Sequence, residues 1–162
     1  MNDALLAALH RSDFRVVHIS IQAAHLHLLV EAADAYALAN GVRAFEISAA
    51  HRLNRAIGRR GRVFVDRYHA TAIRSRRGAR NALAYVLNNW RRHREDRGHA
   101  WRVDPYSSAV AFPGWRALAR PFAWPRGFEP LTVAFPTVWL LTTGWRRYGP
   151  IDLRERPGPD AA

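Results

Sequence analysis

The chain has 162 residues, 49% of them hydrophobic and 23% charged, which predicts one compact domain with its own core. It contains no cysteine, and this excludes disulfides, thiolate nucleophiles and cysteine-bound zinc and fits a reducing cytoplasm. No apolar run approaches the roughly 18 residues that a membrane span requires, so we expect no membrane partner. The formal net charge is +12, from 25 arginines, no lysine and 13 acidic residues.

The positive charge is concentrated in the middle third of the chain. Residues 51–102 hold 15 arginines and 3 acidic residues, a balance of +12, whereas the other residues hold 10 of each and balance to zero. Such clustering predicts a face that binds a polyanion, because the release of counterions from phosphate backbones drives binding. Codon bias in a GC-rich genome can explain the use of arginine in place of lysine, but not its clustering.

The first half of the chain predicts a hairpin flanked by helices. We expect a short helix over 4–9, followed by strands over 14–21 and 25–31 that a turn joins into a hairpin. Asp34 is a suitable N-cap for a long helix that ends near Gly58 and has a weak position at Gly41. The core stripe of this helix is expected to comprise Leu38, Val42, Phe45, Ala49 and Leu53.

The second half predicts one more strand and one more long helix. The strand is expected over 63–73 and the helix over about 79–94, with a basic loop at 74–78 between them. After residue 98 the chain becomes rich in proline and tryptophan, and only 137–148 has a regular pattern. We therefore expect a core over 1–98 and a loop-rich extension over 99–162, whose end from residue 154 onward is disordered.

Two histidines of the second predicted strand are candidate metal ligands. His25 and His27 are two residues apart, so on a strand both imidazoles project to one side and can reach one divalent ion. The alternative is an exposed strand on which polar residues simply alternate with apolar ones.

The helix predicted over 79–94 places a tyrosine away from its core side. Its apolar arc comprises Leu83, Val86, Leu87 and Trp90, and its polar stripe comprises Asn81, Tyr85, Asn88, Asn89 and Arg92. Tyr85 lies in the middle of the polar stripe, with Asn89 one turn further on. A phenol nucleophile and an amide oxygen able to meet a metal are a suitable pair for phosphodiester chemistry. The alternative is a solvated helix face.

Several motifs, in order along the chain, resemble the single-tyrosine HUH transposases. His25-Leu26-His27 resembles that family's His-hydrophobic-His strand, and residues 61–69 resemble its next strand. Tyr85-Val86-Leu87-Asn88-Asn89 resembles its tyrosine helix, where an amide ligand follows the nucleophile after four residues. Residues 104–108 and 139–149 are similar to the tail of a branch related to the REP-associated tyrosine transposases. The resemblance runs from about residue 5 to residue 157.

The resemblance implies an α+β fold with a ferredoxin-like antiparallel sheet and helices on one face. In that family a first strand precedes the first helix and lies beside the metal-binding strand, whereas this chain begins within the helix. We therefore expect a sheet that lacks its first strand, a consequence of a misplaced start codon or a truncated gene. The strand that carries His25 and His27 would then expose an unpaired edge.

The resemblance also implies metal-dependent cleavage and transfer of single-stranded DNA at hairpin-forming repeats, which is DNA transposition, in the bacterial cytoplasm. Tyr85 would form a 5′-phosphotyrosine, and His25, His27 and Asn89 would bind Mg²⁺ or Mn²⁺. The expected partner is single-stranded or hairpin DNA, and both monomers and homodimers occur among relatives. A catalytically inactive, truncated or domesticated remnant that still binds nucleic acid is the alternative. A replication initiator or relaxase usually carries a third histidine or further modules.

Other side chains are candidate contacts to DNA. Six arginines beside the tyrosine helix can grip phosphates, unless they are simply solvated: Arg74, Arg76, Arg77, Arg80, Arg91 and Arg92. His69 is an accessory candidate, with an exposed strand position as the alternative, and His18 receives no role. Three tryptophans can stack on unpaired bases, although we favour their packing the extension onto the core: Trp101, Trp115 and Trp124.

Overall fold

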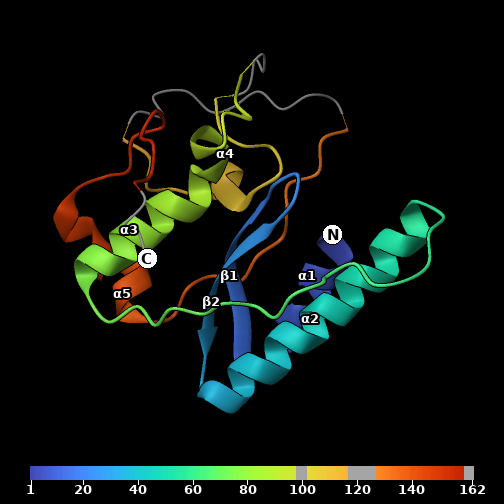
Figure 1. Cartoon of the computed structure of the whole chain (residues 1–162). Helices are drawn as coiled ribbons and strands as arrows, with labels where there is room; N and C mark the ends of the chain where they lie inside the picture. Colours follow the sequence, from blue (N-terminus) through green and yellow to red (C-terminus); the bar gives the residue numbers. More distant parts are fainter. Residues whose placement is uncertain (98–101, 117–126, 159–162) are drawn as a thin grey trace.

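The computed structural model describes residues 1–97, 102–116 and 127–158, and its centre is an antiparallel hairpin (Figure 1). Strand β1 (Phe14–Ile21) pairs with β2 (Leu26–Ala32), and a bulge interrupts their register between Val16 and His18. The backbone N–H of Gln22 donates to the carbonyl of His25 at 2.9 Å and closes the turn. The predicted hairpin is confirmed, with His25 in the turn, one residue before β2.

Helices α1 (Asn2–Leu9) and α2 (Ala35–Ala56) cover one face of the hairpin. Asp34 caps α2 as predicted, because its side chain accepts a hydrogen bond of 2.7 Å from the N–H of Ala37. The core on this face comprises Ala4, Leu5, Ala8, Phe14, Val16, Ile19, Val42, Phe45 and Ala49. Leu53 is exposed, so the predicted core stripe of α2 ends one turn earlier than expected.

Gly41 of α2 packs directly against the hairpin. A Cβ atom added at this position would lie 2.1 Å from the ring of Phe14, which is fully buried. A glycine within a helix lowers its stability relative to alanine by roughly 1 kcal/mol. Here the absence of a side chain allows α2 to pack closely on β1, which offsets that loss.

Helix α3 (Arg76–Leu87) packs on the opposite face of the hairpin (Figure 1). The short helix α4 (Asn89–Arg92) follows it, and the C-terminal helices η1 (Ser108–Ala111), α5 (Trp139–Thr142) and η2 (Gly144–Tyr148) lie on this side. The expectation of helices on one face is therefore wrong, although the mixed α/β class is confirmed. The physical reason is that the strands bury apolar side chains on both faces, with Val17 and Leu29 directed toward α3.

The strand predicted over 63–73 is not formed, and the segment is irregular. Phe64 packs against the cluster beneath α1 and α2, whereas Ile73 packs against the cluster beneath α3. Because its two ends are anchored on opposite faces, the segment crosses from one side of the hairpin to the other (Figure 1). It therefore cannot run along a sheet edge as a strand would.

The C-terminal part is tied to the hairpin by a buried carboxylate. Glu31 of β2 accepts hydrogen bonds from the backbone N–H groups of Thr137 and Val138, at 2.8–3.0 Å, and these residues precede α5. The regular segment predicted over 137–148 is confirmed as α5 and η2. Residues 154–158 are ordered against α3, so the predicted disorder is wrong for them, and residues 159–162 lie outside the described part of the chain.

The two edges of the hairpin differ. The outer edge of β1 is partly covered, because the N–H of Ala134 donates to the carbonyl of Val16 at 2.8 Å and Ser107 forms a bridge with Ser20. Between described residues, no backbone hydrogen bond reaches the outer edge of β2. The described helices include none that is long and apolar enough to cross a membrane.

Candidate active site

Three histidines and one tyrosine form a continuous series of ring contacts beside the turn of the hairpin. The ring of His27 lies edge-on to Tyr85, with centroids 4.9 Å apart, and edge-on to His25 at the same distance. His25 in turn contacts His93, at 4.7 Å between centroids. The structure thus brings together the two predicted histidines and the predicted tyrosine, and adds a third histidine.

The local sequence explains why these rings meet. On β2, His27 and Leu29 lie on one face, and Leu29 belongs to the core that β2 shares with α3. The same face therefore carries His27 against the last turn of α3, where Tyr85 lies. His93 follows α4 as its C-cap residue.

Asn89 is the most unusual side chain of the site. It is 0% exposed, and neither its Oδ1 nor its Nδ2 atom has a hydrogen-bond partner among the described residues. It lies four residues after Tyr85 and four before His93, whose rings contact His27 and His25. The Nε2 atom of His27 is likewise buried without a partner. Each buried polar group without a partner lowers the free energy of unfolding by roughly 1–3 kcal/mol, and a bound ligand that interacts with it would offset this loss.

The donor atoms suit a divalent cation. Two imidazole nitrogens and an amide oxygen are ligands that Mn²⁺ and, through the oxygen, Mg²⁺ accept. No group of three or more His, Cys, Asp or Glu residues in the described ranges is arranged as a metal site. A site formed by His25 and His27 would therefore need a further ligand of another type, such as the amide oxygen of Asn89. The orphaned amide and the orphaned His27 nitrogen fit that requirement.

The electrostatic surroundings keep His27 uncharged. Burial, followed by the electrostatic interactions with His25, His93 and Arg92, lowers the pKa of His27 from 6.5 to about 4. A neutral imidazole is the form that binds a metal. The guanidinium carbon of Arg92 lies 5.5 Å from the centroid of the Tyr85 ring, which places positive charge beside the phenol.

The helix predicted over 79–94 is interrupted at Asn88, and it begins three residues earlier than expected. Ser75 caps α3 by accepting a hydrogen bond of 3.0 Å from the N–H of Gly78. Asn88 ends the helix in a non-helical conformation, and its Nδ2 atom donates to the carbonyl of Asp152 at 3.0 Å. The prediction placed Asn88 on a polar stripe, but this residue is buried and holds the C-terminal segment.

Two of the six predicted DNA-binding arginines form ion pairs within the protein. Arg80 makes a bidentate contact with Glu155, and this hydrogen-bonded pair raises the pKa of Arg80 and lowers that of Glu155. Arg91 binds Asp96 at 2.9 Å and donates to the carbonyl of Arg102 at 2.8 Å. Both therefore stabilise the fold, and their assignment to DNA is not supported by these contacts.

The other four arginines have no ion pair with a described residue. Arg76 and Arg77 lie over the rings of Trp139 and Tyr148, at 5.3 and 5.4 Å from the centroids. Arg74 is exposed, and Arg92 lies beside Tyr85 while donating to the carbonyl of residue 158 at 2.8 Å.

The remaining predicted residues lie away from the ring cluster. His69 is exposed on the irregular segment, and no contact between described residues joins it to the cluster. Trp115 is buried and donates from Nε1 to the carbonyl of Ala109 at 2.9 Å, so it attaches the C-terminal part to the core as favoured. Trp101 and Trp124 lie outside the described residues.

Two features of this part of the structure were not predicted from the sequence. His93 follows the helix interruption, and the signal that could have revealed it is its position one turn beyond Asn89. The second is a buried polar network on the edge of β1, where His18 Nδ1 lies 2.9 Å from Ser108 Oγ. Asp104 accepts hydrogen bonds there from Gln22 and from the N–H of Tyr106.

This network holds residues 104–108 against β1, and its groups are buried from any substrate. Burial lowers the pKa of His18 to about 4 and raises the pKa of Asp104. A neutral, inaccessible His–Ser pair is a structural contact. The ring cluster, which includes partly exposed side chains, is therefore the better candidate for chemistry.

No family model matches the chain, and no curated protein or solved structure matches it.

Proposed function

We propose that this protein is a metal-dependent enzyme that cleaves single-stranded DNA and transfers the strand through a 5′-phosphotyrosine on Tyr85. The observation that carries the proposal is the contact between Tyr85 and a half-buried, neutral His27, whose buried Nε2 atom lacks a partner, as does the buried amide of Asn89 one turn after Tyr85. In this proposal His25, His27 and Asn89 hold Mg²⁺ or Mn²⁺. The bound ion would supply Lewis acidity toward the scissile phosphate.

In this proposal the protein supplies the nucleophile and a positive charge beside it. The Tyr85 oxygen attacks phosphorus, its proton passes to water, and the bond from phosphorus to the 3′-oxygen breaks. That oxygen takes a proton from water and leaves as a 3′-hydroxyl. Arg92, beside the ring of Tyr85, offsets the negative charge of the phosphodiester. Because the phosphotyrosine conserves a phosphodiester bond, attack by a 3′-hydroxyl reverses the step without ATP.

The substrate of this proposal is single-stranded DNA at hairpin-forming repeats, in DNA transposition. The four arginines without an ion pair support a polyanionic substrate, and three of them lie at the start of α3. The core over 1–98 would be a ferredoxin-like domain with an incomplete sheet. The outer edge of β2, which no described backbone group pairs, supports this part of the proposal. A native mass measurement decides between a monomer and a homodimer.

The test is a covalent-adduct assay in Mn²⁺ with hairpin DNA that has randomised single-stranded flanks. The label is placed on the 3′ end, because a 5′-phosphotyrosine retains the 3′-side fragment. We expect an adduct that survives denaturation with the wild type and with Tyr106→Phe, which alters an exposed tyrosine outside the cluster, and none with Tyr85→Phe. An equal adduct in Tyr85→Phe refutes the assigned nucleophile. DNA binding by the wild type without any adduct favours the inactive remnant.

A further inference from the structure

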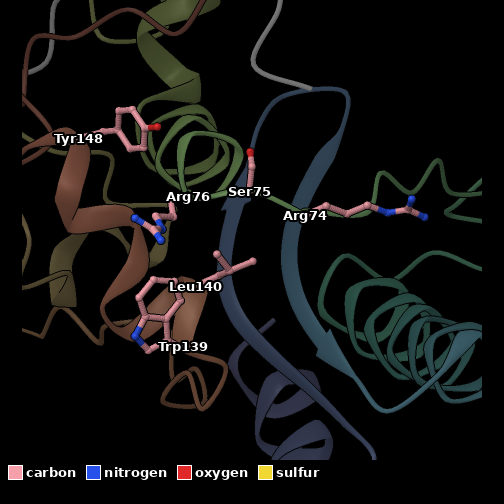
Figure 2. A pocket seen from close by; sticks show the side chains of 6 residues that line it. All are labelled: Arg74, Ser75, Arg76, Trp139, Leu140 and Tyr148. Carbon is pink, nitrogen blue, oxygen red and sulfur yellow. The ribbon is translucent and has the colours of Figure 1, made fainter.

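A pocket of about 400 Å³ opens at the N-terminal end of α3, away from the ring cluster. Its lining combines arginine and aromatic side chains and contains no acidic residue: Arg74, Ser75, Arg76, Trp139, Leu140 and Tyr148. Figure 2 shows Arg76 directed toward Trp139, with Tyr148 on the same side of the helix end and Arg76 between the two rings, whereas the Arg74 side chain points away.

The aromatic rings of this pocket are unusually exposed. Trp139 is 54% and Tyr148 46% exposed, although both belong to segments that pack on α3. Trp139 is also held in place, because a Cβ atom at Gly144 would lie 2.7 Å from its ring. A large flat ring that is fixed on one side and open on the other loses little conformational entropy when a ligand stacks on it.

The charge of the pocket selects an anionic ligand. The guanidinium of Arg76 lies 5.3 Å from the Trp139 centroid and that of Arg77 lies 5.4 Å from the Tyr148 centroid, and neither forms an ion pair with a described residue. A ligand with a flat π-face and a phosphate satisfies both kinds of side chain. An unpaired nucleotide has both groups.

We propose that this pocket binds one unpaired nucleotide of single-stranded DNA, with its base stacked on Trp139 and its phosphate paired with Arg76. The base takes the place of the Arg76 guanidinium on the exposed part of the ring, and the flexible arginine stem lets the charge follow the phosphate. This inference rests on the proposed function for the identity of the strand.

The position of the pocket relative to Tyr85 fits a single bound strand. Residues 76 and 85 are nine residues apart on α3, which corresponds to about 13.5 Å along the helix axis. At roughly 3.4 Å per stacked nucleotide, this distance spans about four nucleotides. The pocket therefore holds a nucleotide near the cleavage point without touching the reacting atoms, and it selects single strands because a duplex conceals its base faces.

The experiment compares two labelled chains of equal length and charge: oligo-dT, and an abasic sugar–phosphate chain. Binding is measured by anisotropy in EDTA, so that no chemistry contributes. Trp139→Ala should weaken oligo-dT binding roughly 5- to 100-fold and leave abasic binding unchanged, since base–aromatic stacking requires the base. Arg76→Gln should weaken binding of both chains. The matched control is Phe135→Ala, which removes an 89% exposed ring outside the pocket and should change neither.

The outcomes separate this inference from the proposed function. Equal losses for oligo-dT and the abasic chain in Trp139→Ala, or no loss, overturn the stacking pocket even if the Tyr85 adduct forms. A selective loss with no adduct from the wild type supports the pocket and refutes the enzyme. Circular dichroism verifies folding, and if Trp139→Ala does not fold, Trp139→Leu replaces it. That variant keeps an apolar side chain at the position but removes the flat ring, and it must then show the same selective loss.

Discussion

Replacing Asn89 with leucine should stabilise the metal-free protein while removing its response to metal. The amide is fully buried and lacks a described partner at both polar atoms, so the folded state bears a desolvation cost of roughly 1–3 kcal/mol. Leucine has the same number of side-chain heavy atoms, branched at the same carbon, and no polar atom. We therefore expect Asn89→Leu to raise the free energy of unfolding in EDTA by roughly 1–3 kcal/mol.

The matched control is the preceding residue. Asn88 is equally buried, but its Nδ2 atom donates to the carbonyl of Asp152 at 3.0 Å. Asn88→Leu leaves the part-buried carbonyl of Asp152 without its donor, so the free energy of unfolding should fall by roughly 1–3 kcal/mol. Two adjacent asparagines of the same burial should thus respond with opposite signs.

The assay is urea denaturation followed by far-UV circular dichroism, with and without Mn²⁺. A metal at a hundred times its dissociation constant raises the free energy of unfolding by about 2.7 kcal/mol, and we expect this gain in the wild type and in Asn88→Leu. Asn89→Leu should show little or none of it and should form no DNA adduct. If Asn89→Leu is destabilised in EDTA as strongly as Asn88→Leu, the amide has partners of its own and is not held for a ligand.

Three further predictions test the fold. Gly41→Ala should lower the free energy of unfolding by roughly 1–3 kcal/mol in thermal or urea denaturation, because the new Cβ would lie 2.1 Å from the Phe14 ring; an unchanged or raised stability contradicts this close packing. Glu155→Gln should cost roughly 1–2 kcal/mol at pH 7 by breaking the bidentate contact with Arg80, and the loss should be matched by Arg80→Gln. The pKa of His18 is lowered from 6.5 to about 4, so the unfolded state takes up a proton first as the pH falls. The free energy of unfolding should therefore drop by about 3 kcal/mol between pH 6.5 and pH 4, and His18→Gln should remove that part of the dependence.

Hydrophobic periodicity predicted the elements whose buried face is set by their own sequence. The alternation in 14–21 and 25–31 predicted the hairpin, and Asp34 was predicted as the cap of α2, where its side chain accepts a backbone N–H group. The cap of α3 was not predicted, because Ser75 lies in the segment expected to be a basic loop. The segment 63–73 has a similar alternation, but its fate depends on where its ends are anchored. Phe64 and Ile73 belong to different cores, and nothing within the segment itself records that.

The candidate site divides in the same way. His25 with His27, and Tyr85 with Asn89, were predicted as pairs because their members lie two and four residues apart in the sequence. The structure places His25 in the turn before β2 and Asn89 in α4, and it adds His93, which was not predicted. The carbonyl that holds Asn88 belongs to a residue 64 positions further along the chain. A helix end fixed by so distant a contact has no signature in the local pattern.

Counting charges located the excess of arginine within residues 51–102, but it could not show which of these arginines form ion pairs within the protein. The carboxylate that pairs with Arg80 comes from residue 155, outside the segment that carries the excess charge. Loss of DNA binding in an Arg80 variant would therefore reflect a loosened C-terminal segment, since the same segment also receives hydrogen bonds from Asn88 and Arg92. Arg76 lies over an exposed ring and forms no ion pair with a described residue, so its charge is available to a ligand. Of the arginines that give the chain its net charge of +12, those able to bind an anionic ligand are the ones that the fold leaves without a carboxylate partner.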